Sequence, residues 1–235
     1  MGYLAIDQSS WSGPFTDAEA EAAKAVGVRL VIVNTWGEWC RQQAEMTLKH
    51  GLDLEAYTYM YPSLDAATRI REALDALYGF PLNGVFWLDY EDDDAAYYSP
   101  REVVAHIRQA VATCEAKGLR PGIYTRRSWW EPYTGSCSEF AHLPLWDARY
   151  DGVASFDYFK PYGGWTRPLM KQFTGTTVVG GQTVDVSWRE DALSEQERIE
   201  LALRKAAAGL TKLLADLEFQ KVADAMKVYL GVAAK

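Results

Sequence analysis

Two carboxylates separated by one residue follow a strongly apolar run near the middle of the 235-residue chain. The run Val85–Leu88 is typical of a buried strand, and Asp89, Tyr90 and Glu91 come directly after it. Side chains alternate along a strand, so Asp89 and Glu91 point to one side while Tyr90 points to the other. Isolated buried carboxylates are costly unless they are paired or protonated. Two of them on one face at the end of a strand suit acid/base chemistry, and the pattern predicts an enzyme.

Two further carboxylates belong to other predicted strands. Asp7 ends the first apolar run of the chain, and Asp185 lies in the last one. If the strands close into a barrel, these elements adjoin at the end where such barrels carry their active sites. We therefore expect Asp7, Asp89, Glu91 and Asp185 to converge in one cleft as the catalytic residues.

Strand and helix patterns alternate along the first half of the chain. The predicted strands are Tyr3–Asp7, Arg29–Asn34, Asp53–Tyr59, Gly84–Glu91, Arg120–Thr125, Pro144–Arg149, Leu169–Phe173 and Thr183–Val186. The predicted helices are Thr16–Val26, Glu38–Lys49, Ser63–Leu77 and Pro100–Lys117, two of them opened by Thr16 or Ser99 as N-cap. After residue 126 there is little room for full helices, so we expect loops or short helical turns there.

This alternation implies βαβ units and a parallel sheet, and eight strands favour a closed barrel. The fold class that we predict is α/β, a modified β/α barrel with about five βα units plus three closing strands. Its site should lie at the carboxyl-terminal ends of the strands.

The composition changes near residue 190. From Ser194 onward the chain has no proline and is rich in Ala, Leu, Lys and Glu. Apolar residues alternate there in steps of four and three, the spacing of a helical seam, at Ile199, Leu203, Ala206, Leu210, Leu213 and Leu217. We expect a barrel domain of residues 1–190 and an amphipathic C-terminal helical extension of residues 191–235. Its apolar stripe must pack on the barrel, on itself or on a second copy. In the last case the extension would be an oligomerisation element and the protein a homo-oligomer.

Charge and composition exclude several classes of partner. The formal net charge of −8 argues against nucleic acid as a main partner, and the apolar runs are shorter than the roughly 20 residues of a membrane span. Cys40, Cys114 and Cys137 have neither metal-site spacing nor an even disulfide framework, so we expect at least two buried free thiols. We expect no metal and no cofactor. No signal peptide precedes the first strand, which predicts synthesis in the cytoplasm or a leader already removed.

An ordered set of motifs resembles the family 25 glycoside hydrolases, the lysozymes (muramidases) common among phage endolysins and bacterial cell-wall hydrolases. The motifs span roughly residues 2 to 188 and are Ala5–Ser9, Trp87–Glu91, Arg120–Thr125, Leu145–Tyr150, Lys171–Thr174 and Val184–Ser187. The resemblance implies a barrel of five βα units and three closing strands. It also implies hydrolysis of the β-1,4 bond between N-acetylmuramic acid and N-acetylglucosamine in bacterial peptidoglycan, by a phage-encoded protein that needs no leader or by a secreted one.

The chain departs from the family pattern in three places and at its tail. Lys171 stands where Trp is usual before Gln172, Thr58 follows Tyr57 where many members have Tyr-His, and Asp93-Asp94 extends the acidic stretch. The helical tail has no counterpart in the family domain. These departures bear on the substrate more than on the reaction.

The resemblance and the chemistry of glycosidic bonds assign roles to the four carboxylates. Glu91 is the general acid and later the general base, which requires a raised pKa. Asp89 either attacks or stabilises the anomeric carbon, or orients the substrate's own N-acetyl group as the nucleophile, and the family likeness favours the second route. Asp7 and Asp185 would hold the water, the N-acetyl group or Glu91.

Four other residues are candidates for substrate binding. Tyr57, Tyr124 and Trp146 would form the floor and donate hydrogen bonds, and Gln172 would be a polar partner. A purely structural role is equally compatible with each of the four.

Three rival functions remain open from the sequence. The first is a non-catalytic cell-wall-binding or virion structural module on the same barrel. The second is a glycosidase that cuts chitin-like polymers through an Asp-x-Glu motif. The third is a metal enzyme at the acid cluster, which the absence of histidine at the strand ends disfavours.

Overall fold

The computed structural model describes residues 2–82 and 84–190, together with Leu217 and Lys221. The chain divides into two units, Met1–Ala192 and Leu193–Lys235, and the barrel belongs to the first. The predicted helical tail of residues 191–235, with its role in self-association, lies outside the described residues except at Leu217 and Lys221, which are helical and exposed. In the described part of the chain, no helix has the length and apolar character that a membrane crossing requires.

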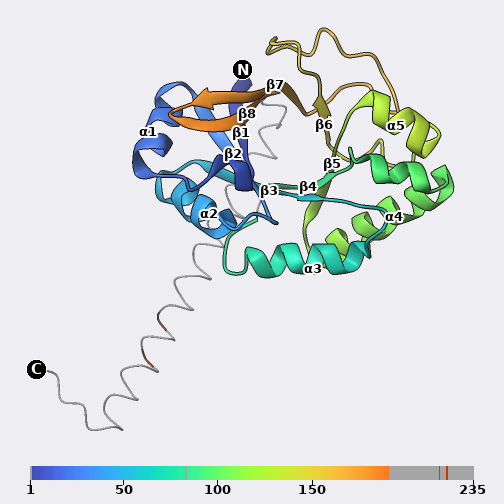
Figure 1. Cartoon of the computed structure of the whole chain (residues 1–235), viewed down its shortest axis with the longest axis horizontal. Helices are drawn as coiled ribbons and strands as arrows, with labels where there is room; N and C mark the ends of the chain where they lie inside the picture. Colours follow the sequence, from blue (N-terminus) through green and yellow to red (C-terminus); the bar gives the residue numbers. More distant parts are fainter. Residues whose placement is uncertain (1, 83, 191–216, 218–220, 222–235) are drawn as a thin grey trace, which may run out of the picture. The chain divides into compact units, whose positions relative to one another are not determined.

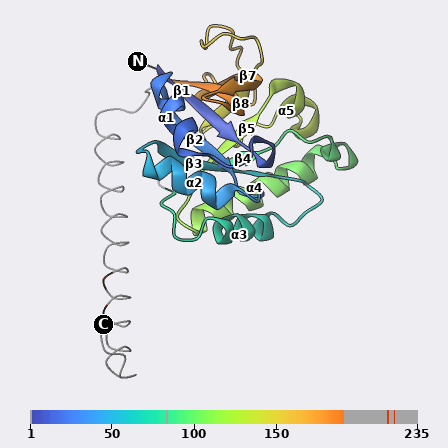
Figure 2. The same ribbon diagram turned by 60° about the vertical axis from the view of Figure 1, so that its left-hand side comes forward.

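Within the described residues, eight strands form one closed barrel in chain order, with the helices packed around it (Figures 1 and 2). The strands are β1 (Gly2–Gln8), β2 (Val28–Asn34), β3 (Asp53–Tyr59), β4 (Val85–Asp89), β5 (Arg120–Thr125), β6 (Leu145–Ala148), β7 (Met170–Val179) and β8 (Gln182–Glu190). The helices are α1 (Asp17–Ala25), α2 (Cys40–Lys49), α3 (Ala66–Ala76), α4 (Pro100–Ala116) and α5 (Arg127–Thr134), with 3-10 turns η1 (Ser10–Ser12) and η2 (Asp93–Tyr97).

The direction of the strands explains how the barrel closes. Neighbours from β1 to β7 pair in parallel, and β8 runs antiparallel between β7 and β1. Each of the first five strands is followed by a helix, as βαβ units require. The prediction of a modified β/α barrel with five βα units and three closing strands is confirmed.

Several element boundaries differ from the predicted ones, and the differences at β4, α5 and the β7–β8 hairpin have physical reasons. Strand β4 ends at Asp89, although the amide of Tyr90 still donates to the carbonyl of Tyr124 at 2.9 Å. Helix α5 is a full two-turn helix where only turns were expected, because Pro132 inside it obscures the helical pattern. Strands β7 and β8 extend into a long hairpin, whose two-residue turn Gly180-Gly181 has positive φ at both positions.

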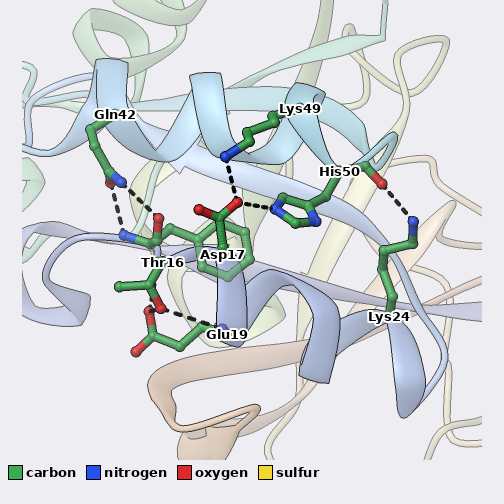
Figure 3. Close-up of polar contacts among 8 residues, drawn as sticks. Thr16, Asp17, Glu19, Lys24, Gln42, Lys49 and His50 are labelled. Carbon is green, nitrogen blue, oxygen red and sulfur yellow. Dashed lines mark hydrogen bonds and ion pairs between the residues drawn. The ribbon is translucent and has the colours of Figure 1, made fainter.

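Polar contacts at the start of α1 fix this helix against α2 (Figure 3). The predicted capping box is present: the Thr16 amide donates to Glu19 Oε2 at 2.7 Å, and the Glu19 amide donates to Thr16 Oγ1 at 3.3 Å. Asp17 Oδ1 accepts hydrogen bonds from Lys49 Nζ at 2.6 Å and from His50 Nε2 at 2.7 Å. These two donors at the end of α2 lower the pKa of Asp17.

Side chains along each strand alternate between the barrel interior and the layer beneath the helices. The interior cluster contains Trp87 and Trp146, with ring centroids 5.5 Å apart. A Cβ on Gly122 would lie 2.7 Å from the Trp87 ring, so glycine in β5 leaves the space that this ring fills. The outer layer packs strands on helices, and Cys40 and Cys114 lie in it as buried free thiols, as predicted.

A buried ion pair lies in the barrel interior towards the amino-terminal ends of the parallel strands. Glu55 Oε1 accepts hydrogen bonds from Arg189 Nη1 at 2.7 Å and from the Val85 amide at 3.0 Å. Glu55 Oε2 accepts from Trp87 Nε1 at 2.7 Å. All three donors are directed at one buried carboxylate, so both charges of the pair are satisfied.

We predict that Glu55→Gln lowers the free energy of unfolding by about 3–5 kcal/mol, because it leaves the Arg189 guanidinium buried without its counter-ion. Urea denaturation followed by circular dichroism measures this change. Glu139→Gln, which breaks the exposed pair with Arg108, is the control and should change the unfolding free energy little. If the two substitutions change the unfolding free energy by the same small amount, the buried pair does not stabilise the barrel.

Candidate active site

The four predicted catalytic carboxylates lie at the carboxyl-terminal end of the parallel strands. Asp7 in β1 and Asp185 in β8 are direct partners across the antiparallel pair. Asp89 ends β4, and Glu91 follows two residues later. Tyr90 points outward into the layer beneath the helices, so the predicted alternation of this tripeptide is retained.

The Gln172 side chain on β7 joins two of the carboxylates to two tyrosines. Its Nε2 donates to Asp7 Oδ2 at 2.9 Å and to Asp185 Oδ2 at 3.3 Å. Its Oε1 accepts from the hydroxyls of Tyr124 at 2.6 Å and Tyr150 at 2.7 Å. All the hydrogen-bonding capacity of the amide is used, so Gln172 fixes the relative positions of these groups.

Asp7 and Asp89 are buried, and both have strongly raised pKa values. Burial is the largest cause in each case, because a buried carboxylate loses its hydration. Repulsion from Asp185 adds to the shift at Asp7, and repulsion from Glu91 adds to it at Asp89. Among the described residues, Asp89 Oδ1 has no hydrogen-bond partner. Asp89 therefore retains an acceptor atom that no protein group uses.

Glu91 is less buried than Asp7 and Asp89, and its pKa is also raised. Burial is again the main cause, and the nearby Arg126 cation opposes it. The Tyr124 hydroxyl, 3.5 Å from Glu91 Oε2, also lowers the Glu91 pKa. A carboxyl group that keeps its proton to higher pH, and that remains partly exposed, has the properties of a general acid.

The three aromatic residues predicted as floor residues lie directly beneath the carboxylates and are almost fully buried. Trp146 packs edge-on against Tyr124, with centroids 4.6 Å apart, and donates from Nε1 to Ser187 Oγ at 3.0 Å. The Tyr57 hydroxyl accepts a hydrogen bond from Asn34 Nδ2 at 3.1 Å. Burial of Trp146 favours a supporting role for this residue over direct contact with a ligand.

Several residues of the site were not singled out from the sequence. Tyr150 contacts Gln172, Arg126 acts on Glu91, Asn34 contacts Tyr57, and Tyr59 pairs in register with Asp89. Tyr59 could have been found, because it shares a strand face with Tyr57. Asn34 and Arg126 end or follow strands at positions where no periodic pattern marks them. Tyr150 is the last residue of the Leu145–Tyr150 motif, which marks its position without assigning it a role.

The acid cluster does not have the geometry of a metal site. In residues 2–82 and 84–190, no group of three or more His, Cys, Asp or Glu side chains is arranged to hold a metal ion. The amide of Gln172 lies between Asp7 and Asp185 and donates to both. The absence of a metal requirement stays a prediction.

Comparison with known proteins identifies the family. The model of the family described as "Lysozyme-like protein 1" matches residues 8–173 of the chain. The chain belongs to this lysozyme-like family. The matched region begins at Gln8, directly after Asp7, and contains the Asp89-Tyr90-Glu91 segment and Gln172. It therefore covers most of the site.

Individual relatives agree with the predicted resemblance to family 25. The chain is 36% identical over 134 residues to "Probable GH family 25 lysozyme 2" of Dictyostelium discoideum, covering 55% of the chain and 63% of the relative. It is 29% identical over 201 residues to "Counting factor 50" of the same organism, covering 80% of the chain and 66% of the relative. The solved structure of a muramidase from Trichobolus zukalii has a TM-score of 0.68 at 22% identity, covering 83% of the chain and 97% of the muramidase.

These comparisons fix the family and the fold. The chain spans just under two thirds of the length of these two curated relatives. The muramidase shares the barrel along nearly its whole length. The roles of the eight predicted site residues remain predictions that rest on the geometry described above.

We predict that Asp89→Asn raises the free energy of unfolding at neutral pH by roughly 0.5–2 kcal/mol. The folded-state pKa of Asp89 lies above its unfolded value, so its contribution to stability is fully present at acidic pH and is lost as pH rises through the folded-state pKa. Asparagine cannot ionise and removes this loss. Thermal unfolding of both proteins from pH 4 to 8 measures the effect. A difference that shrinks, rather than grows, as pH rises would contradict a raised pKa at this residue.

Proposed function

We propose that the chain is a muramidase that hydrolyses the β-1,4 bond between N-acetylmuramic acid and N-acetylglucosamine in bacterial peptidoglycan. The observation that carries the proposal is the pair of carboxyl groups with raised pKa, Asp89 and Glu91, beside two more carboxylates at the site-bearing end of the barrel. Membership of a lysozyme-like family supports it. Such a protein would act at the bacterial cell wall, whether encoded by a phage or secreted with its leader removed.

Glu91 supplies the proton that the leaving group needs. In the first step its carboxyl proton moves to the glycosidic oxygen as the bond to the anomeric carbon breaks. In the second step the Glu91 carboxylate takes a proton from water, whose oxygen attacks the same carbon and displaces the acetamido oxygen that became bound to it in the first step. The raised pKa of Glu91 keeps the acid form available for the first step.

Asp89 assists by orienting the N-acetyl group of the substrate. The acetamido oxygen attacks the anomeric carbon as the glycosidic bond breaks, and the acetamido N–H needs an acceptor that stabilises the positive charge formed on it. Asp89 Oδ1 is an acceptor that no described protein group uses. A direct attack by Asp89 on the anomeric carbon is the alternative route, and both routes use the ionised Asp89 carboxylate.

Asp7, Asp185 and Gln172 hold the remaining polar groups in place. Gln172 donates to both aspartates, and the Thr176 amide donates to Asp185 Oδ1 at 2.6 Å. Asp185 also raises the pKa of Glu91. We assign these residues to positioning Glu91 and the attacking water.

We predict that Glu91→Gln lowers the rate of peptidoglycan hydrolysis at least a hundredfold, because the amide has no proton to transfer. Release of reducing ends from purified peptidoglycan, with analysis of the terminal sugar, measures this rate and identifies the bond. Asp93→Asn, the same chemical change at an exposed residue two positions along the chain, is the matched control and should retain activity. Release of N-acetylglucosamine rather than N-acetylmuramic acid ends would overturn the assigned bond.

A second candidate function is wall binding without cleavage. It is the non-catalytic alternative on the same barrel that the sequence leaves open. If the wild-type protein sediments with peptidoglycan but releases no reducing ends from several wall types, this second function replaces the first.

We predict that Arg126→Gln shifts the alkaline limb of the kcat/KM pH profile to higher pH. Activity falls as pH rises through the Glu91 pKa, because the ionised carboxylate cannot donate its proton. The Arg126 cation lowers this pKa, so its removal raises the pKa and extends activity upward. Arg127→Gln, at the neighbouring arginine paired with Glu131, is the control. An unchanged or downward-shifted limb in Arg126→Gln would rule out Glu91 as the group that titrates there.

A further inference from the structure

Trp36 is a large apolar side chain exposed at the same end of the barrel as the carboxylates. It lies two residues after the end of β2 and is 54% exposed. Its amide donates to Asn34 Oδ1 at 2.8 Å, and Asn34 in turn contacts Tyr57 of the site. Its backbone is therefore anchored to the site, although about half of the side chain is exposed.

The guanidinium of Arg69 covers one face of the Trp36 ring, with its central carbon 3.5 Å from a ring centroid. Arg69 is only 3% exposed, and it donates from Nη2 to the carbonyl of Tyr59 at 3.3 Å and from Nη1 to Glu72 at 3.0 Å. Its Nε has no partner among the described residues. Burying an arginine with an unused N–H is costly, and the arrangement stabilises the ring orientation of an exposed tryptophan.

A continuous row of aromatic rings connects Trp36 with the carboxylates. The ring of Tyr61 lies 5.8 Å from that of Trp36 and 4.9 Å from that of Tyr59. Tyr59 is the register partner of Asp89 on the neighbouring strand. Burial is the main reason that the pKa of Tyr59 is raised, and the charges of Asp89 and Glu91 raise it further. A ligand that extends from the carboxylates along this row meets Trp36.

A cavity of about 760 Å³ lies beside the Trp36 ring. Its volume is in the range of small-ligand pockets, and Trp36, Glu38, Leu64, Arg69 and Glu72 are among the residues that line it. Asp65 also lines it, which gives three carboxylates against one guanidinium. The charge disfavours an anionic ligand and fits a neutral one.

We propose that Trp36 and this cavity form a distal subsite that binds a neutral sugar ring, an N-acetylglucosamine unit of the glycan strand beyond the bond that is cleaved. The flat C–H face of a hexopyranose stacks on an indole, and the Arg69 guanidinium fixes the indole before the sugar arrives. This inference rests on the proposed muramidase function and adds the length of glycan that the site recognises.

The test uses the full chain with Glu91→Gln, so that bound glycan is not cleaved. Calorimetry measures its affinity for soluble peptidoglycan oligosaccharides of two, four and six sugars. We expect affinity to increase with length. Adding Trp36→Ala should lower the affinity for the longest oligosaccharide about tenfold and leave that for the disaccharide unchanged. Trp36→Phe should restore most of the loss, because it retains a flat ring.

The matched control is Tyr78→Ala, which removes an exposed aromatic ring that follows α3 at the opposite end of the barrel. It should leave all affinities unchanged. The proposal is wrong if affinity does not increase with length, or if Trp36→Ala retains the increase. Hydrolysis of peptidoglycan by the wild-type protein is measured in parallel. If the wild-type protein cleaves peptidoglycan but Trp36→Ala does not change glycan affinity, the distal subsite is refuted and the proposed muramidase function stands.

Discussion

The burial of several carboxylates together at one end of a closed barrel is the constraint on which the site depends. Antiparallel pairing of β8 with β1 places Asp7 and Asp185 directly opposite each other. The neutral amide of Gln172 donates to both, so their positions are fixed without a counter-ion. Burial nevertheless raises the pKa values of Asp7, Asp89 and Glu91, and repulsion from neighbouring carboxylates adds to each shift. Carboxyl groups at this end of the barrel therefore keep their protons to higher pH, and a glycosidic oxygen would need such a proton when its bond breaks.

Much of this arrangement follows from local patterns in the sequence. The alternation of Asp89, Tyr90 and Glu91 is a property of any extended chain, and the structure retains it even past the end of β4. The capping box at Ser99 fixed the start of α4 because its contacts span only three residues. Eight apolar runs with helices between them leave a closed barrel as the arrangement that pairs every strand. Local periodicity and pairing rules were therefore sufficient for the fold.

The contacts that tune the site were not predictable in this way. Gln172 was a candidate only as a polar partner, because its four hydrogen bonds join three strands and a loop that are distant in sequence. Arg126 influences Glu91 from the N-cap of α5, a short helix that Pro132 obscured. The feature that distinguishes Trp36, the buried Arg69 guanidinium against its ring, joins two elements more than thirty residues apart in the chain. Each of these depends on side chains brought together by the closed barrel rather than on spacing along the chain.

The departure at Lys171 has a structural reason of the same kind. Its neighbour Gln172 points into the site, so Lys171 points outward, and it is fully buried. Lys171 Nζ donates to Asp151 Oδ1 at 2.6 Å and lies 3.9 Å from the centre of the Tyr158 ring. Both partners belong to the connection between β6 and β7, which also carries Tyr150, a donor to Gln172. The lysine therefore holds this connection in place, and through Tyr150 the connection contacts the Gln172 amide.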